Sequence, residues 1–158
     1  MGWLEELYGS IVCVDTTPFI VYIEDNPTYA SMLEPFFKAV EDRNIFVVTS
    51  VMTLLEVLVH PIRDNDEQLI QRYQEVLFGS IGFTTVNVNR VIAEQAARLR
   101  ASYNIRTPDS IQMATAIVYN AKYFLTNDLR LPSLAGLTVL KLDELKTQSN
   151  SIEQTDEQ

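Results

Sequence analysis

The chain has 158 residues, 47% of them hydrophobic and 21% charged, which is typical of one globular domain with a single core. Its net charge of −9 argues against a protein that coats nucleic acid non-specifically, because phosphate contacts need a basic surface. The same charge is compatible with an enzyme whose acids hold metal ions, since bound cations reverse the local field.

The first half of the chain alternates short apolar runs with helical patterns. Pro35 lies inside the second helix, where we expect a kink or a division into two short pieces. The elements predicted here are a short amphipathic lead-in over 1–10, a strand over 11–14, a helix opened by Thr17 and Pro18, a turn over 25–27, a helix over 28–42, a strand over 45–48, a helix over 51–59 closed by His60 and Pro61, and a helix over 64–78.

The second half repeats this alternation. A helix that begins after Thr107 and Pro108 has apolar residues at helical spacing, so one of its faces is buried. The elements predicted here are strands over 83–86, 122–125 and 137–140, a helix over 89–103, and the helix that follows Thr107. Residues 146–158 are polar and acidic without periodicity, which predicts a disordered tail.

Strands separated by helices predict a three-layer α/β/α fold with a central, mostly parallel sheet of four to five strands. We expect this domain to span residues 11–145, with an N-terminal extension over 1–10 and the tail over 146–158. No apolar run is long enough to cross a membrane, and the first residues lack the pattern of a secretory signal. The lone Cys13 excludes an intramolecular disulfide, so we expect a buried thiol in a cytoplasmic protein.

Four acids stand where such a fold brings side chains together. Asp15 follows the first strand, Glu56 lies inside an apolar helix, Asp109 lies in a first helical turn, and Asp128 follows the fourth strand. Ligands of open parallel sheets bind beyond the carboxyl ends of the strands, so all four acids can gather at one edge. Carboxylates without histidine or cysteine favour hard cations such as Mg²⁺ or Mn²⁺, which suit phosphodiester hydrolysis.

Each of these acids also has a purely structural interpretation. Asp109 could serve the helix macrodipole, Asp128 could be a turn residue, and Glu56 could be a salt-bridged helix acid. For Glu56 the metal site is the better interpretation, because an idle carboxylate among apolar neighbours is costly. Arg106 could bind a phosphate or a partner's carboxylate, or it could pair with Asp109. His60, the one histidine, fits a helix-end residue better than a general base.

The residues around these acids form four motifs. They are Val14-Asp15-Thr16-Thr17-Pro18-Phe19-Ile20, Thr49-Ser50-Val51-Met52-Thr53-Leu54-Leu55-Glu56, Thr107-Pro108-Asp109-Ser110-Ile111-Gln112-Met113-Ala114-Thr115-Ala116, and Phe124-Leu125-Thr126-Asn127-Asp128. In this order, over about residues 11–142, they resemble the PIN-domain ribonucleases found as VapC-like toxins of type II toxin–antitoxin pairs.

The resemblance implies a metal-dependent endoribonuclease that uses Mg²⁺ or Mn²⁺. It implies that Asp15, Glu56, Asp109 and Asp128 are the catalytic, metal-binding acids. Thr16 and Thr126 match small hydroxyl positions near the metal, and we expect Asn127 to support the ligands with them. The implied partners are an RNA, with tRNA or another structured RNA as the substrate to test, a cognate antitoxin that Arg106 could contact, and a second copy of the chain in a homodimer.

Two further functions remain alternatives. One is a catalytically inactive PIN fold that binds RNA or protein; the four acids argue against it without demonstrating turnover. The other is a different acidic α/β protein. A phosphatase of the haloacid-dehalogenase kind needs a second aspartate two residues after the first, where Thr17 stands, and no receiver-domain set of adjacent acids and a late lysine is apparent.

Overall fold

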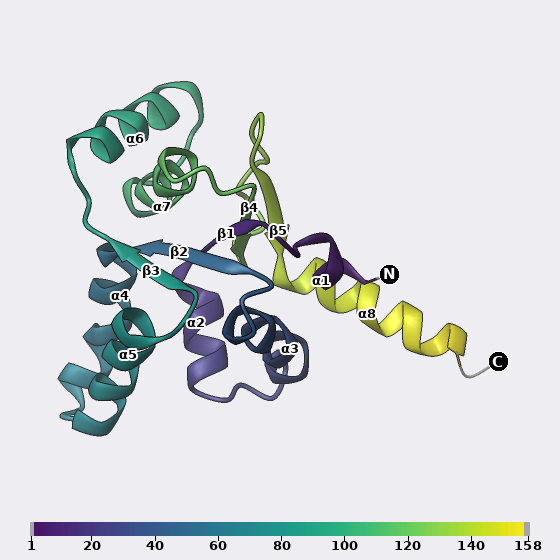
Figure 1. Ribbon diagram of the computed structural model, residues 1–158. Coiled ribbons are helices and arrows are strands. Elements are labelled where there is room, and N and C mark those ends of the chain that lie inside the picture. Colours follow the sequence, from purple (N-terminus) through teal and green to yellow (C-terminus); the bar gives the residue numbers. More distant parts are fainter. Residues whose placement is uncertain (1, 157–158) are drawn as a thin grey trace.

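The structure, a computed structural model, describes residues 2–156. Strands and helices alternate along most of the chain, as the sequence predicts (Figure 1). The elements are α1 (Trp3–Glu6), β1 (Ile11–Val14), α2 (Thr16–Ile23), α3 (Ala30–Glu41), β2 (Phe46–Ser50), α4 (Val51–Arg63), α5 (Glu67–Gly79), β3 (Phe83–Val86), α6 (Arg90–Ser102), α7 (Thr107–Val118), β4 (Tyr123–Thr126), β5 (Thr138–Lys141) and α8 (Leu142–Asp156).

The sheet has five strands in the order β3-β2-β1-β4-β5, and every neighbouring pair is parallel. This confirms the predicted α/β fold and its parallel sheet. The chain builds outward from β1 to β2 and β3, and then returns to the other side of β1 to place β4 and β5. The direction of winding therefore reverses between β1 and β4, which is the point where parallel sheets of this kind bind their ligands.

Helices cover both faces of the sheet (Figure 1). Helices α6 and α7 lie on one face, and α2, α3, α4 and α5 lie on the other. Strand β1 divides its side chains between the two cores: Val12 and Val14 pack with α2 to α5, and Cys13 packs with α6 and α7. Both cores are apolar, so β1 is buried on both faces, which explains why its sequence is continuously hydrophobic.

Several helix ends differ from the prediction. Helix α2 begins at Thr16 because the Asp15 carboxylate accepts the Thr16 N–H and caps the helix, in place of Thr17. Helix α3 runs through Pro35 as one helix, not as two short pieces. Helix α4 likewise continues past Pro61 to Arg63. Its last turn is stabilised by a hydrogen bond from the Asp64 N–H to the His60 carbonyl.

The two ends of the chain are structured in the described residues. Helix α1 brings Trp3 onto Phe36, with ring centroids 6.2 Å apart. The predicted disordered tail is helical in the structure, where α8 extends to Asp156; its last two residues lie outside the described part. Buried Leu142 and Leu145 anchor the first turn of α8, and polar side chains further along bond back to carbonyls four residues earlier. No described helix is long and apolar enough to cross a membrane.

Candidate active site

The candidate site lies at the reversal point between β1 and β4. Asp15 directly follows β1, and Asp128 lies two residues beyond the end of β4. The Asp15 N–H continues the ladder between the two strands by donating to the carbonyl of Leu125 at 2.9 Å. The fold therefore brings together two acids that are separated by more than a hundred residues of chain, at the edge that the sequence predicts.

Asp15 is almost fully buried, with 8% of its surface exposed. Its carboxylate accepts the Thr16 N–H at 2.8 Å and the Thr126 hydroxyl at 2.8 Å. Burial raises the pKa of Asp15 to about 6; its two hydrogen bonds oppose this shift, and the nearby charges of Asp109 and Glu56 add to it. Two of the other predicted acids are thus close enough to act on Asp15.

Two threonines connect the acids. The Thr126 hydroxyl donates to Asp15 and accepts the Asp128 N–H at 3.1 Å, so it joins the ends of β1 and β4. Thr16, at the start of α2, donates its hydroxyl to the Glu56 carboxylate on α4 at 2.9 Å. Both side chains are buried and support acids, in the positions that the resemblance assigns to small hydroxyl residues.

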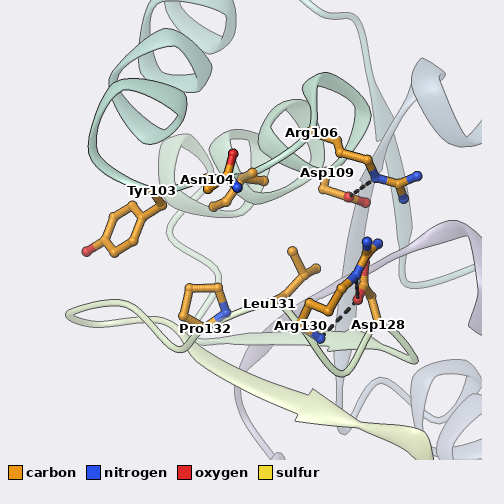
Figure 2. Close-up of a pocket in the computed structure, with 9 residues that line it drawn as sticks. Tyr103, Asn104, Arg106, Asp109, Asp128, Arg130, Leu131 and Pro132 are labelled. Atoms are coloured by element: carbon orange, nitrogen blue, oxygen red, sulfur yellow. Dashed lines mark hydrogen bonds and ion pairs between the residues drawn. The ribbon is translucent and has the colours of Figure 1, made fainter.

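The other two acids are paired with arginines (Figure 2). Asp109, in the first turn of α7 and 8% exposed, accepts the Arg106 Nε–H at 3.2 Å. Asp128 accepts two guanidinium N–H groups of Arg130, at 3.0 and 2.9 Å. The hydrogen bonds from Arg130 lower the pKa of Asp128, and the charge of Arg106 adds to this effect. Of the two interpretations of Arg106, the structure therefore has the pair with Asp109.

Asn127, which the sequence analysis groups with Thr16 and Thr126, makes its hydrogen bonds away from the acids. Its amide donates to the Tyr29 hydroxyl at 3.2 Å and accepts the Asp143 N–H of α8 at 3.3 Å. The side chain thus connects the end of β4 to α8 and to the start of α3, outside the hydrogen bonds that join the acids. His60 is exposed along α4 and makes no hydrogen bond or ion pair within residues 2–156 that would draw it to the site.

A buried polar cluster behind the acids was not predicted from the sequence. Gln112, on the same helix as Asp109, donates to the Thr53 hydroxyl and accepts the Ser50 hydroxyl at 2.9 Å. Thr53 also contacts the hydroxyls of Thr49, at 2.9 Å, and Thr16, at 3.4 Å. Through Thr53, this cluster connects α7, β2 and α4 to Thr16, which donates to Glu56. The available signal was a glutamine at a core position of an apolar helix, since such a residue needs partners.

The chemistry of the acids fits a hard divalent cation, because every ligand atom they offer is a carboxylate oxygen. Asp15 fits best: it is buried, is held by neutral donors alone among the described residues, and is repelled by two other acids. No group of three or more histidine, cysteine, aspartate or glutamate side chains in residues 2–156 is arranged to hold a metal ion. Arg106 contacts one carboxylate oxygen of Asp109, and Arg130 contacts both carboxylate oxygens of Asp128, so these arginines would compete with a cation for the two acids.

The sequence and fold identify the family. Residues 12–137 match the model of the PIN domain, and the chain therefore belongs to the PIN-domain family. No curated protein matches the chain by sequence.

Solved structures share the fold. A chain of VapBC2 from Rickettsia felis, crystallised with a DNA fragment from their promoter, superposes with a TM-score of 0.64 at 17% identity, covering 83% of this chain and 98% of that one. A chain of a toxin–antitoxin complex from Klebsiella pneumoniae gives 0.61 at 23% identity, covering 80% and 95%. A chain of FitAcB from Neisseria gonorrhoeae gives 0.56 at 18% identity, covering 82% and 96%.

Proposed function

We propose that the protein is a metal-dependent endoribonuclease that hydrolyses RNA phosphodiester bonds and acts as the toxin of a toxin–antitoxin pair. The observation that carries this proposal is that Glu56 and Asp109 lie within electrostatic reach of the buried Asp15, at the reversal point of a PIN-domain sheet. Burying several carboxylates close together destabilises the folded state unless a cation compensates their charge. A fold that keeps these acids together is therefore consistent with a bound metal ion.

Asp15, Glu56, Asp109 and Asp128 would hold Mg²⁺ or Mn²⁺. When bound, the metal would lower the pKa of a water molecule and neutralise charge on the phosphate. Thr126 would keep Asp15 and the backbone of Asp128 in register, through the two hydrogen bonds that it already makes. Thr16 would hold Glu56 toward the same edge in the same way.

Arg106 and Arg130 would change partners when substrate binds. Their side chains are 66% and 72% exposed, so each guanidinium can leave its aspartate without repacking of the core. Once a cation compensates the acids, both arginines are free to contact an RNA phosphate, which guanidinium groups bind well. Arg106 could equally receive a carboxylate of an inhibitory antitoxin.

Protein partners are part of the proposal because three structural relatives were crystallised as VapBC, FitAcB or toxin–antitoxin complexes. Helix α4 offers a surface for an antitoxin or for a second copy of the chain. Its outer face exposes Leu55, Val59 and Ile62 side by side, and an apolar face of this kind is typical of a helix that docks with another protein.

A catalytically inactive PIN fold that binds RNA or protein is the second candidate. The specific observation in its favour is that Asp109 and Asp128 are each neutralised by an arginine of the same chain. In this alternative the arginines would remain on the acids permanently, and RNA or a partner protein would bind without being cleaved.

The test is a cleavage assay on structured RNAs, including tRNA, with Mg²⁺, Mn²⁺ or EDTA. We expect cleavage that needs metal, and a loss of about a hundredfold or more in Asp109→Asn, because even indirect supports of metal ligands change activity by up to that factor. Glu94→Gln is the matched control, since Glu94 is an exposed acid on α6 that pairs only with Arg90 among the described residues. Metal binding without cleavage of any RNA would favour the inactive module, and full activity of Asp109→Asn would refute the proposed site.

A further inference from the structure

A pocket of about 360 Å³ opens directly beside the acids. One wall is the connection from α6 to α7, and the other is the segment that follows β4 (Figure 2). Its volume lies at the small end of the range for sites that bind small organic ligands. The residues that decide its chemistry are Tyr103, Asn104, Asp109, Asp128, Arg130 and Pro132.

The pocket changes in character along its length. The acids and their arginines form one end, and Tyr103 and Pro132 lie on opposite walls at the other end (Figure 2). Ile105 and Leu131 also line the pocket, although they are only 5% and 4% exposed. A charged end and an aromatic end within one pocket match the placement of phosphate and base in a nucleotide.

The aromatic end has groups that are free to bind a base. Tyr103 is 41% exposed, and neither its hydroxyl nor the Asn104 amide makes a hydrogen bond within the described residues. Bases of single-stranded RNA stack on aromatic rings and pair their edges with amides. The loop that carries both residues is fixed, because the Tyr103 N–H donates to Leu99 at 2.8 Å and the Arg100 Nε–H donates to Ile105 at 3.1 Å.

We propose that this pocket binds the nucleotide next to the scissile phosphate, with its base on Tyr103 and against Asn104. This inference rests on the proposed ribonuclease function. A peptide from a partner protein is the competing occupant. RNA is favoured because one pocket combines two exposed guanidinium groups, which bind phosphate, with an exposed tyrosine ring and an amide that suit a base.

The experiment is a titration with the nucleoside 5′- and 3′-monophosphates, followed by NMR in Mg²⁺, with ribose 5-phosphate as the probe that lacks a base. We expect at least one nucleotide to bind more tightly than ribose 5-phosphate. Tyr103→Ala is expected to weaken that binding roughly tenfold, as loss of a stacking ring does elsewhere, whereas Tyr103→Phe keeps the ring and the affinity. Tyr119→Ala is the control, because Tyr119 is an exposed tyrosine at the end of α7 and outside the pocket.

Equal binding of ribose 5-phosphate and every nucleotide, or unchanged binding in Tyr103→Ala, would overturn the inference. So would a Tyr103→Ala variant that loses affinity only for a co-expressed antitoxin. Because mononucleotides contain no phosphodiester bond, this result is independent of turnover. Selective nucleotide binding without any RNA cleavage would refute the proposed nuclease activity and would still support the proposed base-binding pocket. Where cleavage is seen, Tyr103→Ala should raise KM more than it lowers kcat and relax the base preference beside the cut.

Discussion

Replacing Asp15 with asparagine should stabilise the metal-free protein while abolishing cleavage. Burial raises the pKa of Asp15 from the ordinary value of 3.8 to about 6, so the folded state binds a proton more tightly than the unfolded state does. The shift is roughly two pKa units, which corresponds to about 3 kcal/mol. Above pH 6 this is the cost of keeping the charged carboxylate in the fold, and asparagine has no such cost.

The direction of the pH dependence follows from proton linkage. Between about pH 4 and pH 6 the folded protein holds a proton on Asp15 that the unfolded chain releases, so the free energy of unfolding falls as pH rises through this window. Below it, Asp15 is protonated in both states and contributes no penalty. The stability of Asp15→Asn minus that of the wild type should therefore grow by about 2 to 3 kcal/mol from pH 4 to pH 7.

Urea unfolding in EDTA at several pH values between 4 and 7 measures this difference, from which titrating groups that do not interact with Asp15 cancel. For a chain of this size, 3 kcal/mol corresponds to a rise of roughly 6 to 12 °C in Tm. Glu94→Gln, which removes one negative charge from an exposed ion pair on α6, is the control for the loss of a charge as such. A difference for Asp15→Asn that does not change between pH 4 and pH 7 would refute the argument that burial raises the pKa of this carboxyl group. Mg²⁺ should stabilise the wild type and have less effect on the variant.

Two further substitutions test the supports of the site and the fold. Gln112→Leu leaves the Ser50 hydroxyl without its acceptor and removes one of the hydrogen bonds of Thr53, so it should cost about 1 to 3 kcal/mol in urea unfolding; a cost near zero would mean that these hydrogen bonds do not stabilise the core. Gly82→Ala should cost about 2 kcal/mol or more in thermal unfolding, because Gly82 has a φ of +81° and a Cβ there would lie 2.7 Å from the Val40 carbonyl oxygen. An unchanged Tm would contradict this.

The sheet and the placement of the acids could be predicted from the sequence because both depend on local patterns. Short apolar runs mark strands that are buried on both faces, as in β1, which has the predicted bounds. The edge strand β3 is only partly buried and also has the predicted bounds. The carboxyl ends of parallel strands share one edge, so Asp15 and Asp128 could be placed together without knowledge of the strand order. The strand order itself depends on long-range packing, which a pattern along the chain does not contain.

Helix ends and hydrogen-bond partners were less predictable, for a different reason. Whether Pro61 ends a helix depends on what the next turn can bond to, and α8 persists because Leu142 and Leu145 find a core to bury in. The hydrogen-bond partner of a polar side chain depends on the tertiary structure. Asn127 follows Thr126 in the sequence, but its amide forms hydrogen bonds with Tyr29 and with α8. The position of a residue in the sequence therefore predicts the region of the fold in which it lies, and the packing of the helices and strands determines its hydrogen-bond partners.

The bonding of the acids explains how the fold tolerates them. The most deeply constrained acid, Asp15, is held by a backbone N–H and a threonine hydroxyl, which are neutral donors that would keep their bonds when a cation arrives. Asp109 and Asp128 are instead compensated by exposed arginines, which are held by charge and can be displaced. The surroundings of Asp15 are thus preorganised and the arginine partners of the other two acids are exchangeable, as the proposed binding of a metal ion and a phosphate requires.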